Sequence, residues 1–176
     1  MLFRPLAIEG VWLIQPERQV DDRGYFARTY CDREFAAHGL PTQFPQCNVS
    51  RNARRGTLRG LHWQDDPNQE GKLVRCVRGA VMDVAVDLRR GSPTRGQWIS
   101  SELTADNGEA LFIPPGFAHG FQTLRDGTEL FYMMTESYRD GLARGLRWND
   151  PTLAISWPLA DPLVSDRDAA LPLFEG

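Results

Sequence analysis

The chain has 176 residues, with 20 basic and 23 acidic side chains and a formal charge of −3. This slight negative charge argues against a nucleic-acid surface. Charged residues interrupt every apolar stretch before it reaches the length of about 18 residues that a membrane span requires. The three cysteines are odd in number and widely spaced, which favours a reducing compartment. We therefore expect a cytoplasmic protein without nucleic-acid or membrane partners, folded as one domain over residues 1–176.

The basic residues are unevenly divided, because 19 are arginine and a single one, Lys72, is lysine. A chain that uses arginine almost everywhere has either one lysine by chance or one position that requires a compact ammonium group. Composition alone leaves both readings open.

Short apolar runs, taken in chain order, predict strands at residues 10–15, 58–64, 72–77, 80–88, 97–103, 110–113, 120–124 and 128–135. Gly, Pro and Asp-Gly pairs separate these runs at intervals typical of a β-sandwich or barrel. A helical pattern is confined to residues 32–38, and a second short helix is expected in the segment after Leu159. The predicted class is therefore all-β.

The run at residues 80–88 alternates between two faces. One face is wholly apolar, whereas the other carries two carboxylates, Asp83 and Asp87. They either line a polar cavity inside a sandwich or face solvent on a one-sided antiparallel sheet. The alternation does not decide between the two.

The chain has three histidines. His38 precedes Gly39 at the end of the predicted helix, where a structural role is expected. His62 and His119 both lie beside glycine and aromatic residues, so they are either core histidines or members of one shared pocket.

Several catalytic signatures are missing from the sequence. There is no H-x-H pair and no Glu within seven residues after His62, so a metal site is not expected. The chain also lacks a G-x-S-x-G elbow, a P-loop and a G-x-G-x-x-G turn. What remains is acid–base chemistry, with His62 as a candidate base and Tyr132 as a candidate acid. Arginines such as Arg59 would suit phosphate groups.

Eight motifs in register nevertheless resemble one family over about residues 11–171. They are DRGYF at 22–26, QCNVS at 46–50, LRGLHWQ at 58–64, GKLVR at 71–75, DVAVDLR at 83–89, SPT at 92–94, IPPGFAHGF at 113–121 and WNDP at 148–151. In this order they resemble the dTDP-4-dehydrorhamnose 3,5-epimerase family. Any one motif is weakly specific, whereas the eight together are strongly specific.

The resemblance implies a cupin-like double-sheet jelly roll with a few short helices near the N-terminal side and the C-terminus. It implies a homodimer that works without a metal or organic cofactor. It further implies a dTDP-4-keto-6-deoxyhexose substrate, inverted at C3 and C5 in dTDP-rhamnose or related deoxysugar biosynthesis.

Site residues follow from the resemblance position by position. His62 matches the base, Asp168 its carboxylate partner, Tyr132 the acid and Lys72 the cation beside the keto oxygen. The positions that match substrate contacts are Arg23, Phe26, Gln46, Asn48, Arg59, His119, Tyr138 and Arg167.

Four positions depart from the family pattern: Arg28, Met133, Ser137 and Ala143. Two of them replace carboxylates, which places the base or the sugar of the substrate in question. Three alternatives therefore stand beside the double epimerase. They are an epimerase acting at C3 or C5 only, a sugar 3,4-ketoisomerase, and a non-catalytic sugar-nucleotide-binding cupin.

Overall fold

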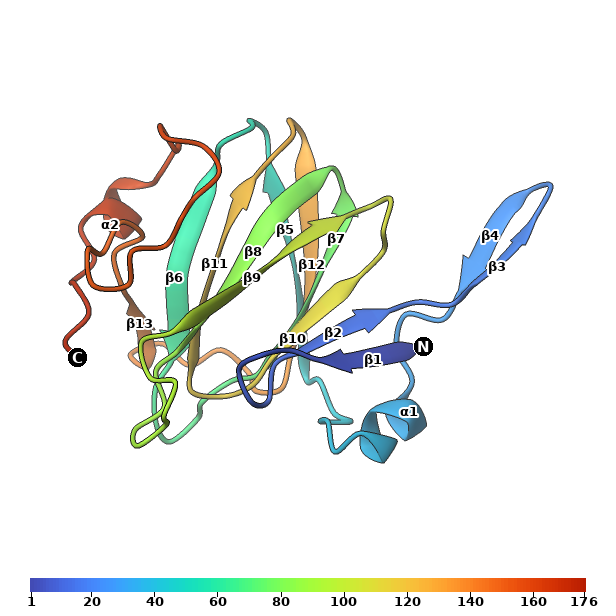
Figure 1. Ribbon diagram of the computed structural model, residues 1–176, viewed down its shortest axis with the longest axis horizontal. Helices are drawn as coiled ribbons and strands as arrows, with labels where there is room; N and C mark the ends of the chain where they lie inside the picture. The colour runs from blue at the N-terminus through green and yellow to red at the C-terminus, as the bar shows by residue number, and fades with distance from the viewer.

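Two antiparallel sheets pack face to face in the computed structural model, which describes residues 1–176 (Figure 1). One sheet has six strands in the order β1-β2-β10-β7-β12-β5, and the other has five in the order β13-β6-β11-β8-β9. Strands β3 and β4 form a separate hairpin. The architecture is a double-sheet jelly roll, which confirms the predicted fold class.

The elements have the following bounds: β1 Leu2–Pro5, β2 Trp12–Gln15, β3 Arg18–Asp21, β4 Gly24–Ala27, α1 Asp32–Ala37, β5 Gln46–Asn52, β6 Leu58–Gln64, β7 Lys72–Arg78, β8 Ala80–Asp87, β9 Trp98–Thr104, β10 Ala110–Ile113, β11 Phe117–Thr123, β12 Thr128–Met134, β13 Ala143–Gly145 and α2 Asp166–Ala169.

Every strand that the apolar runs predict is present, with ends that differ by a few residues. The sequence pattern missed β1, β3, β4, β5 and β13. These strands are short or largely exposed, and β3 is exposed along its whole length. They lack the alternating apolar face that marks a half-buried strand.

Alternation along the strands produces three apolar layers. The largest group of buried side chains lies between the two sheets and includes Val74, Val81, Leu111 and Leu130. A second group lies where α1 covers the outer face of the six-stranded sheet. A third lies where residues after β13 cover the outer face of the five-stranded sheet.

The alternation predicted for residues 80–88 is confirmed. Met82, Val84 and Val86 pack with the outer layer, and Val81 and Ala85 pack between the sheets. Asp83 and Asp87 share the inner face and are both fully buried, so the solvent-facing alternative is wrong. The jelly roll thus carries carboxylates on a face that is otherwise apolar.

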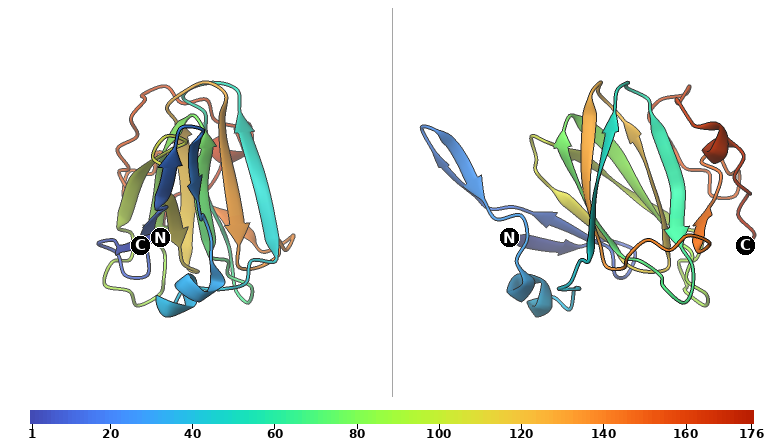
Figure 2. Two further views of the ribbon diagram at one scale, coloured as in Figure 1. Left: turned by 90° about the vertical axis from the view of Figure 1, so that its right-hand side faces the viewer. Right: turned by 180° about the vertical axis from the view of Figure 1, so that it is seen from behind.

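The hairpin β3–β4 stands clear of the body in Figure 1 and in the right-hand view of Figure 2, at the end where the N-terminus lies. Its side chains are exposed, among them Val20, Tyr25 and Phe26. The two helices are short, and neither is long or apolar enough to cross a membrane. At the end of α1, His38 stacks on Phe3 with ring centroids 4.0 Å apart, which supports the structural role expected of this histidine.

Two glycines allow β6 and β11 to approach each other closely. A Cβ atom at Gly60 would lie 2.6 Å from the Cα atom of Gly120 and 2.7 Å from the carbonyl oxygen of His119. Gly60 also has a φ of +118°, which L side chains rarely adopt. Glycine is therefore required here on two independent grounds.

Replacing Gly60 by alanine should lower the melting temperature by about 10 °C, because overpacking of roughly 1–3 kcal/mol adds to the backbone strain. Gly91→Ala is the matched control, since Gly91 also has a positive φ (+77°), but a Cβ atom there would meet nothing within 4 Å. That variant should lose only a few degrees, about the cost of strain alone. Equal losses in the two variants, measured by thermal unfolding, would contradict the role of the close approach.

Candidate active site

A cavity of about 220 Å³ opens between the two sheets and collects half of the twelve site residues singled out from the sequence. The five-stranded sheet contributes Arg59, His62 and His119, whereas the six-stranded sheet contributes Lys72 and Tyr132. His62 and His119 therefore share one pocket, which confirms the second of the two alternatives that the sequence left open.

His62 is paired with a carboxylate from the C-terminal segment. Its Nε2 lies 2.8 Å from Oδ1 of Asp168, which is 5% exposed. A carboxylate only accepts hydrogen bonds, so Nε2 carries the proton and Nδ1 is left free to take one. Asp168 is also held by the backbone N–H of Gly60, at 3.2 Å. Burial raises the pKa of Asp168, but His62, the Gly60 N–H and the charge of Arg167 together outweigh burial and leave that pKa below its ordinary value.

Asp168 reaches His62 across 106 positions of sequence because the C-terminal segment is attached to the start of β6. Leu163 pairs with Thr57 in a parallel bridge, and its carbonyl accepts the N–H of Leu58 at 2.9 Å. Ser165 then caps α2 by accepting the N–H of Asp168 at 3.1 Å. These contacts fix the helix beside the base, a long-range relation that composition and periodicity do not contain.

Tyr132 faces this pair from β12 on the other sheet. Burial raises the pKa of its phenol well above the ordinary value, and the negative charge of Asp83 raises it further. The side chain therefore stays protonated over the physiological range and is suited to donate a proton.

Lys72 is almost fully buried, with 6% exposure, and its Nζ bridges two groups. It donates to the carbonyl oxygen of His62 at 3.0 Å and pairs with Oε1 of Glu70 at 3.0 Å. A point-like ammonium satisfies both partners at the cavity wall. Glu70 was not among the residues predicted from the sequence, although it lies only two positions before Lys72.

An adjoining cavity, also of about 220 Å³, extends from His62 toward the end of β5. Gln46, Asn48, Tyr138 and Arg167 line it, so four more of the predicted substrate contacts lie together. The side-chain oxygen of Gln46 accepts the backbone N–H of Tyr138 at 2.9 Å, which ties the loop after β12 to the edge strand.

Arg23 and Phe26 are not brought to either cavity. They lie on the projecting hairpin, where Phe26 is 72% exposed and Arg23 pairs with Asp21 instead. Within one chain, therefore, hairpin β3–β4 is separated from β6, the strand that carries His62 (Figure 1).

Three of the four departures have local explanations. The guanidinium of Arg28 pairs with Glu34 at 2.8 Å and lines no cavity with His62. Met133 packs in the outer layer beneath α1, facing away from the site. Ala143 lines the adjoining cavity, where its small side chain adds no charge to the wall.

The fourth departure, Ser137, uses its backbone carbonyl to accept a hydrogen bond from Gln64 at 3.2 Å. This contact does not depend on the identity of the Ser137 side chain.

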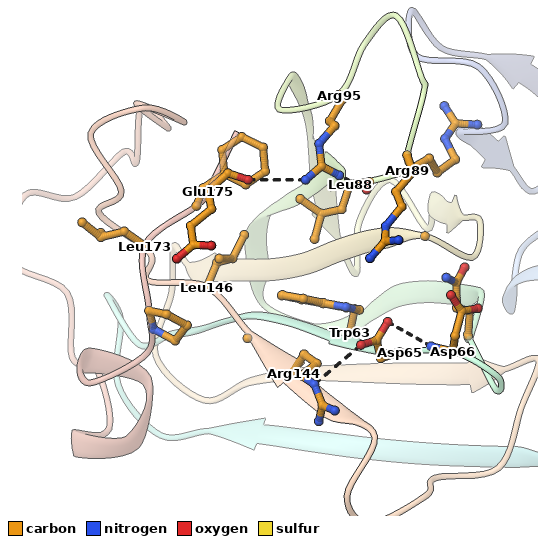
Figure 3. Close-up of a pocket in the computed structure, with 16 residues that line it drawn as sticks. Trp63, Asp65, Asp66, Leu88, Arg89, Arg95, Arg144, Leu146, Leu173 and Glu175 are labelled. Atoms are coloured by element: carbon orange, nitrogen blue, oxygen red, sulfur yellow. Dashed lines mark hydrogen bonds and ion pairs between the residues drawn. The ribbon is translucent and has the colours of Figure 1, made fainter.

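The largest cavity, about 590 Å³, lies on the other side of β6 (Figure 3). Its wall includes Trp63, which alternates with His62 along the strand, but no histidine, lysine or tyrosine. Its charged groups are largely engaged with each other or with the backbone, as in the pairs Arg144–Asp65 and Arg95–Glu175. Size alone does not locate the chemistry in this molecule.

No cluster of three or more His, Cys, Asp or Glu side chains in the structure has a geometry that could hold a metal ion. Fold and site together define a class: a jelly-roll protein with a histidine–aspartate pair and a tyrosine on facing walls of one cavity between its two sheets.

Comparison with known proteins gives the family. The family model described as dTDP-4-dehydrorhamnose 3,5-epimerase matches residues 5–176. The chain therefore belongs to the dTDP-4-dehydrorhamnose 3,5-epimerase family, as the eight motifs predicted.

Individual relatives agree with this assignment. A dTDP-4-dehydrorhamnose 3,5-epimerase of Pseudomonas aeruginosa is 51% identical, over 93% of this chain and 90% of its own length. A dTDP-4-dehydrorhamnose 3-epimerase of Streptomyces niveus is 44% identical, over 96% of this chain and 81% of its own length. The crystal structure of the 3,5-epimerase from Bacillus anthracis with TDP and pyrophosphate bound superposes with a TM-score of 0.94, at 41% identity, over 98% of this chain and 100% of that one.

Lys72→Arg should retain the fold but lower epimerase turnover about 100-fold, the cost of removing one well-placed donor to an oxyanion. Nζ of Lys72 contacts the His62 carbonyl and Glu70 at 3.0 Å each, and a guanidinium would present a planar fork there instead of a single nitrogen. Arg78→Lys, at the exposed end of the same strand, is the control and should leave turnover unchanged. Near-normal turnover of Lys72→Arg would mean that the single lysine is there by chance.

Proposed function

We propose that this protein is an epimerase that inverts C3 and C5 of a dTDP-4-keto-6-deoxyhexose in dTDP-rhamnose or related deoxysugar biosynthesis. The observation that carries the proposal is the placement of His62 and Tyr132 on opposite walls of one cavity. Family membership supports the substrate class.

The base in this proposal is His62. A C–H bond beside a ketone becomes acidic when the resulting enolate is stabilised. Asp168 holds the proton on Nε2 of His62, so Nδ1 removes the proton from the sugar carbon, and the carboxylate stabilises the imidazolium that forms. Carbons C3 and C5 both flank the keto carbon C4, so one ketone activates both centres.

Lys72 supplies the positive charge for the oxygen on C4. Its ammonium group is anchored by Glu70 and the His62 carbonyl, and a third N–H remains for the substrate. The low exposure of the site strengthens this interaction relative to water.

Tyr132 completes each inversion by giving its proton to the carbon from the face opposite His62. The tyrosinate then recovers a proton and the imidazolium loses one, so each inverted centre acquires one hydrogen from solvent. One base and one acid on opposite faces are the minimum for an epimerisation.

The remaining predicted residues divide between sugar and nucleotide in our proposal. Arg59 and His119 border the reaction cavity and would contact the sugar or its first phosphate. The adjoining cavity would hold the nucleotide, with Gln46 and Asn48 as hydrogen-bonding groups, Tyr138 as a stacking surface and Arg167 as a phosphate contact.

We propose that the protein is a homodimer in which the hairpin of one chain covers the cavity of the other. Arg23 and Phe26 would then reach the nucleotide of the partner chain, although they lie away from the cavity of their own. An exposed hairpin that carries Val20, Tyr25 and Phe26 supports an interface, because exposed apolar groups of this kind mark interaction sites.

A cytoplasmic location is also part of the proposal. All three cysteines are unpaired, which supports a reducing compartment.

The second candidate is an epimerase that inverts C3 only. The relative from Streptomyces niveus is named a 3-epimerase and is about as similar to this chain as several relatives named for both centres.

The test is to incubate the protein in deuterium oxide with dTDP-, CDP- and GDP-linked 4-keto-6-deoxy sugars. We expect turnover of the dTDP sugar with one deuterium at C3 and one at C5. Labelling at C3 alone would establish the second candidate. Binding of the dTDP sugar without any labelling would show a non-catalytic protein and contradict the proposal.

A further inference from the structure

Two histidine–carboxylate pairs lie side by side, and the mechanism above uses only one of them. His62 and His119 are direct partners across the ladder of β6 and β11, so both side chains project from the same face of the sheet. Nε2 of His62 lies 2.8 Å from Asp168, and Nε2 of His119 lies 2.8 Å from Oδ1 of Asp83. The second pair is the more deeply buried of the two.

Asp83 is a buried carboxylate with an unsatisfied oxygen, unlike Asp87 on the same strand. Both lie on the inner face of β8 and are fully buried. Asp87 accepts hydrogen bonds from Arg89, Ser92 and Thr94, whereas Oδ2 of Asp83 has no partner at all. A buried carboxylate oxygen left unsatisfied is unfavourable. Its only side-chain partner is His119, which borders the reaction cavity.

The charge of Asp83 also affects the pKa of Tyr132, the proposed acid. The rings of His119 and Tyr132 meet edge to face with centroids 6.0 Å apart. Of the groups that face the phenol, Asp83 and Cys76 raise its pKa beyond the effect of burial, whereas Ser50 and Arg59 lower it. Asp83 therefore opposes formation of a tyrosinate in the resting protein.

We propose that Asp83 is a positioning residue for the epimerisation: it holds the proton on Nε2 of His119, so that Nδ1 is the ring nitrogen presented to a hydroxyl group of the sugar. This inference rests on the proposed function for its catalytic consequence. The state of the imidazole is a property of the free protein and stands on the geometry alone.

The first test reads the ring nitrogens directly by ¹⁵N NMR of the free protein at pH 7. The chain has only three histidines, so His38→Gln and His62→Asn variants assign the remaining signals to His119. We expect His119 to be protonated at Nε2 in the wild type and to lose this preference in Asp83→Asn. An unprotonated Nε2 in the wild type, with the proton on Asp83, would overturn the proposal.

The second test is kinetic and uses Asp87→Asn as the matched control, since that carboxylate is equally buried on the same strand but faces Arg89, Ser92 and Thr94. We expect Asp83→Asn to lower kcat about 10- to 100-fold, the loss typical of removing a carboxylate that orients a histidine at metal sites. Asp87→Asn should lower the melting temperature with kcat within twofold of the wild type. Equal losses of kcat in the two variants would mean that Asp83 is merely structural.

A double variant separates positioning from independent action. If Asp83 acts through His119, the variant with both Asp83→Asn and His119→Asn should turn over no more slowly than the worse single variant. A loss of kcat in the double variant equal to the product of the two single losses would contradict the proposal.

If the wild-type protein epimerises no dTDP sugar, the proposed function fails. The NMR result on the unmodified protein still decides the state of His119, whether or not any variant folds.

Discussion

The close contact between β6 and β11 is the constraint on which the site depends. Gly60 and Gly120 leave no room for side chains between these strands, so the strands approach until His62 and His119 stand directly opposite each other. The same backbone supplies the N–H of Gly60 that orients Asp168. A single close approach thus sets the positions of both histidines and of one carboxylate, and preorganisation of this kind reduces the reorganisation that a reaction requires.

The two sheets divide the chemistry between them. The five-stranded sheet carries His62, His119 and Arg59, whereas the six-stranded sheet carries Tyr132 and Lys72. In the proposed reaction, proton removal and proton return therefore occur from opposite walls, which is the geometry that inversion requires. The cost is a polar interior, because Asp83, Lys72 and Asp168 replace apolar side chains that would pack the jelly roll more stably.

The strands with an apolar face were predictable from the sequence, because period-2 alternation records which side is buried. Hairpin β3–β4 and edge strand β5 were not, since they are held by strand pairing and have no continuous buried face. His62 and Tyr132 stood out as acid–base candidates, but Asp168 entered only through the resemblance to the family. Its approach to His62 depends on how the C-terminal segment attaches to β6, a relation that no local pattern contains.

The most direct test of a base and an acid on opposite walls compares deuterium exchange with inversion in two variants. Tyr132→Phe keeps the base, so it should exchange hydrogen for deuterium at C3 with retained configuration, because the proton returns from the side it left. His62→Asn should show neither exchange nor inversion. Exchange at the wild-type rate in His62→Asn, or full inversion in Tyr132→Phe, would contradict the account.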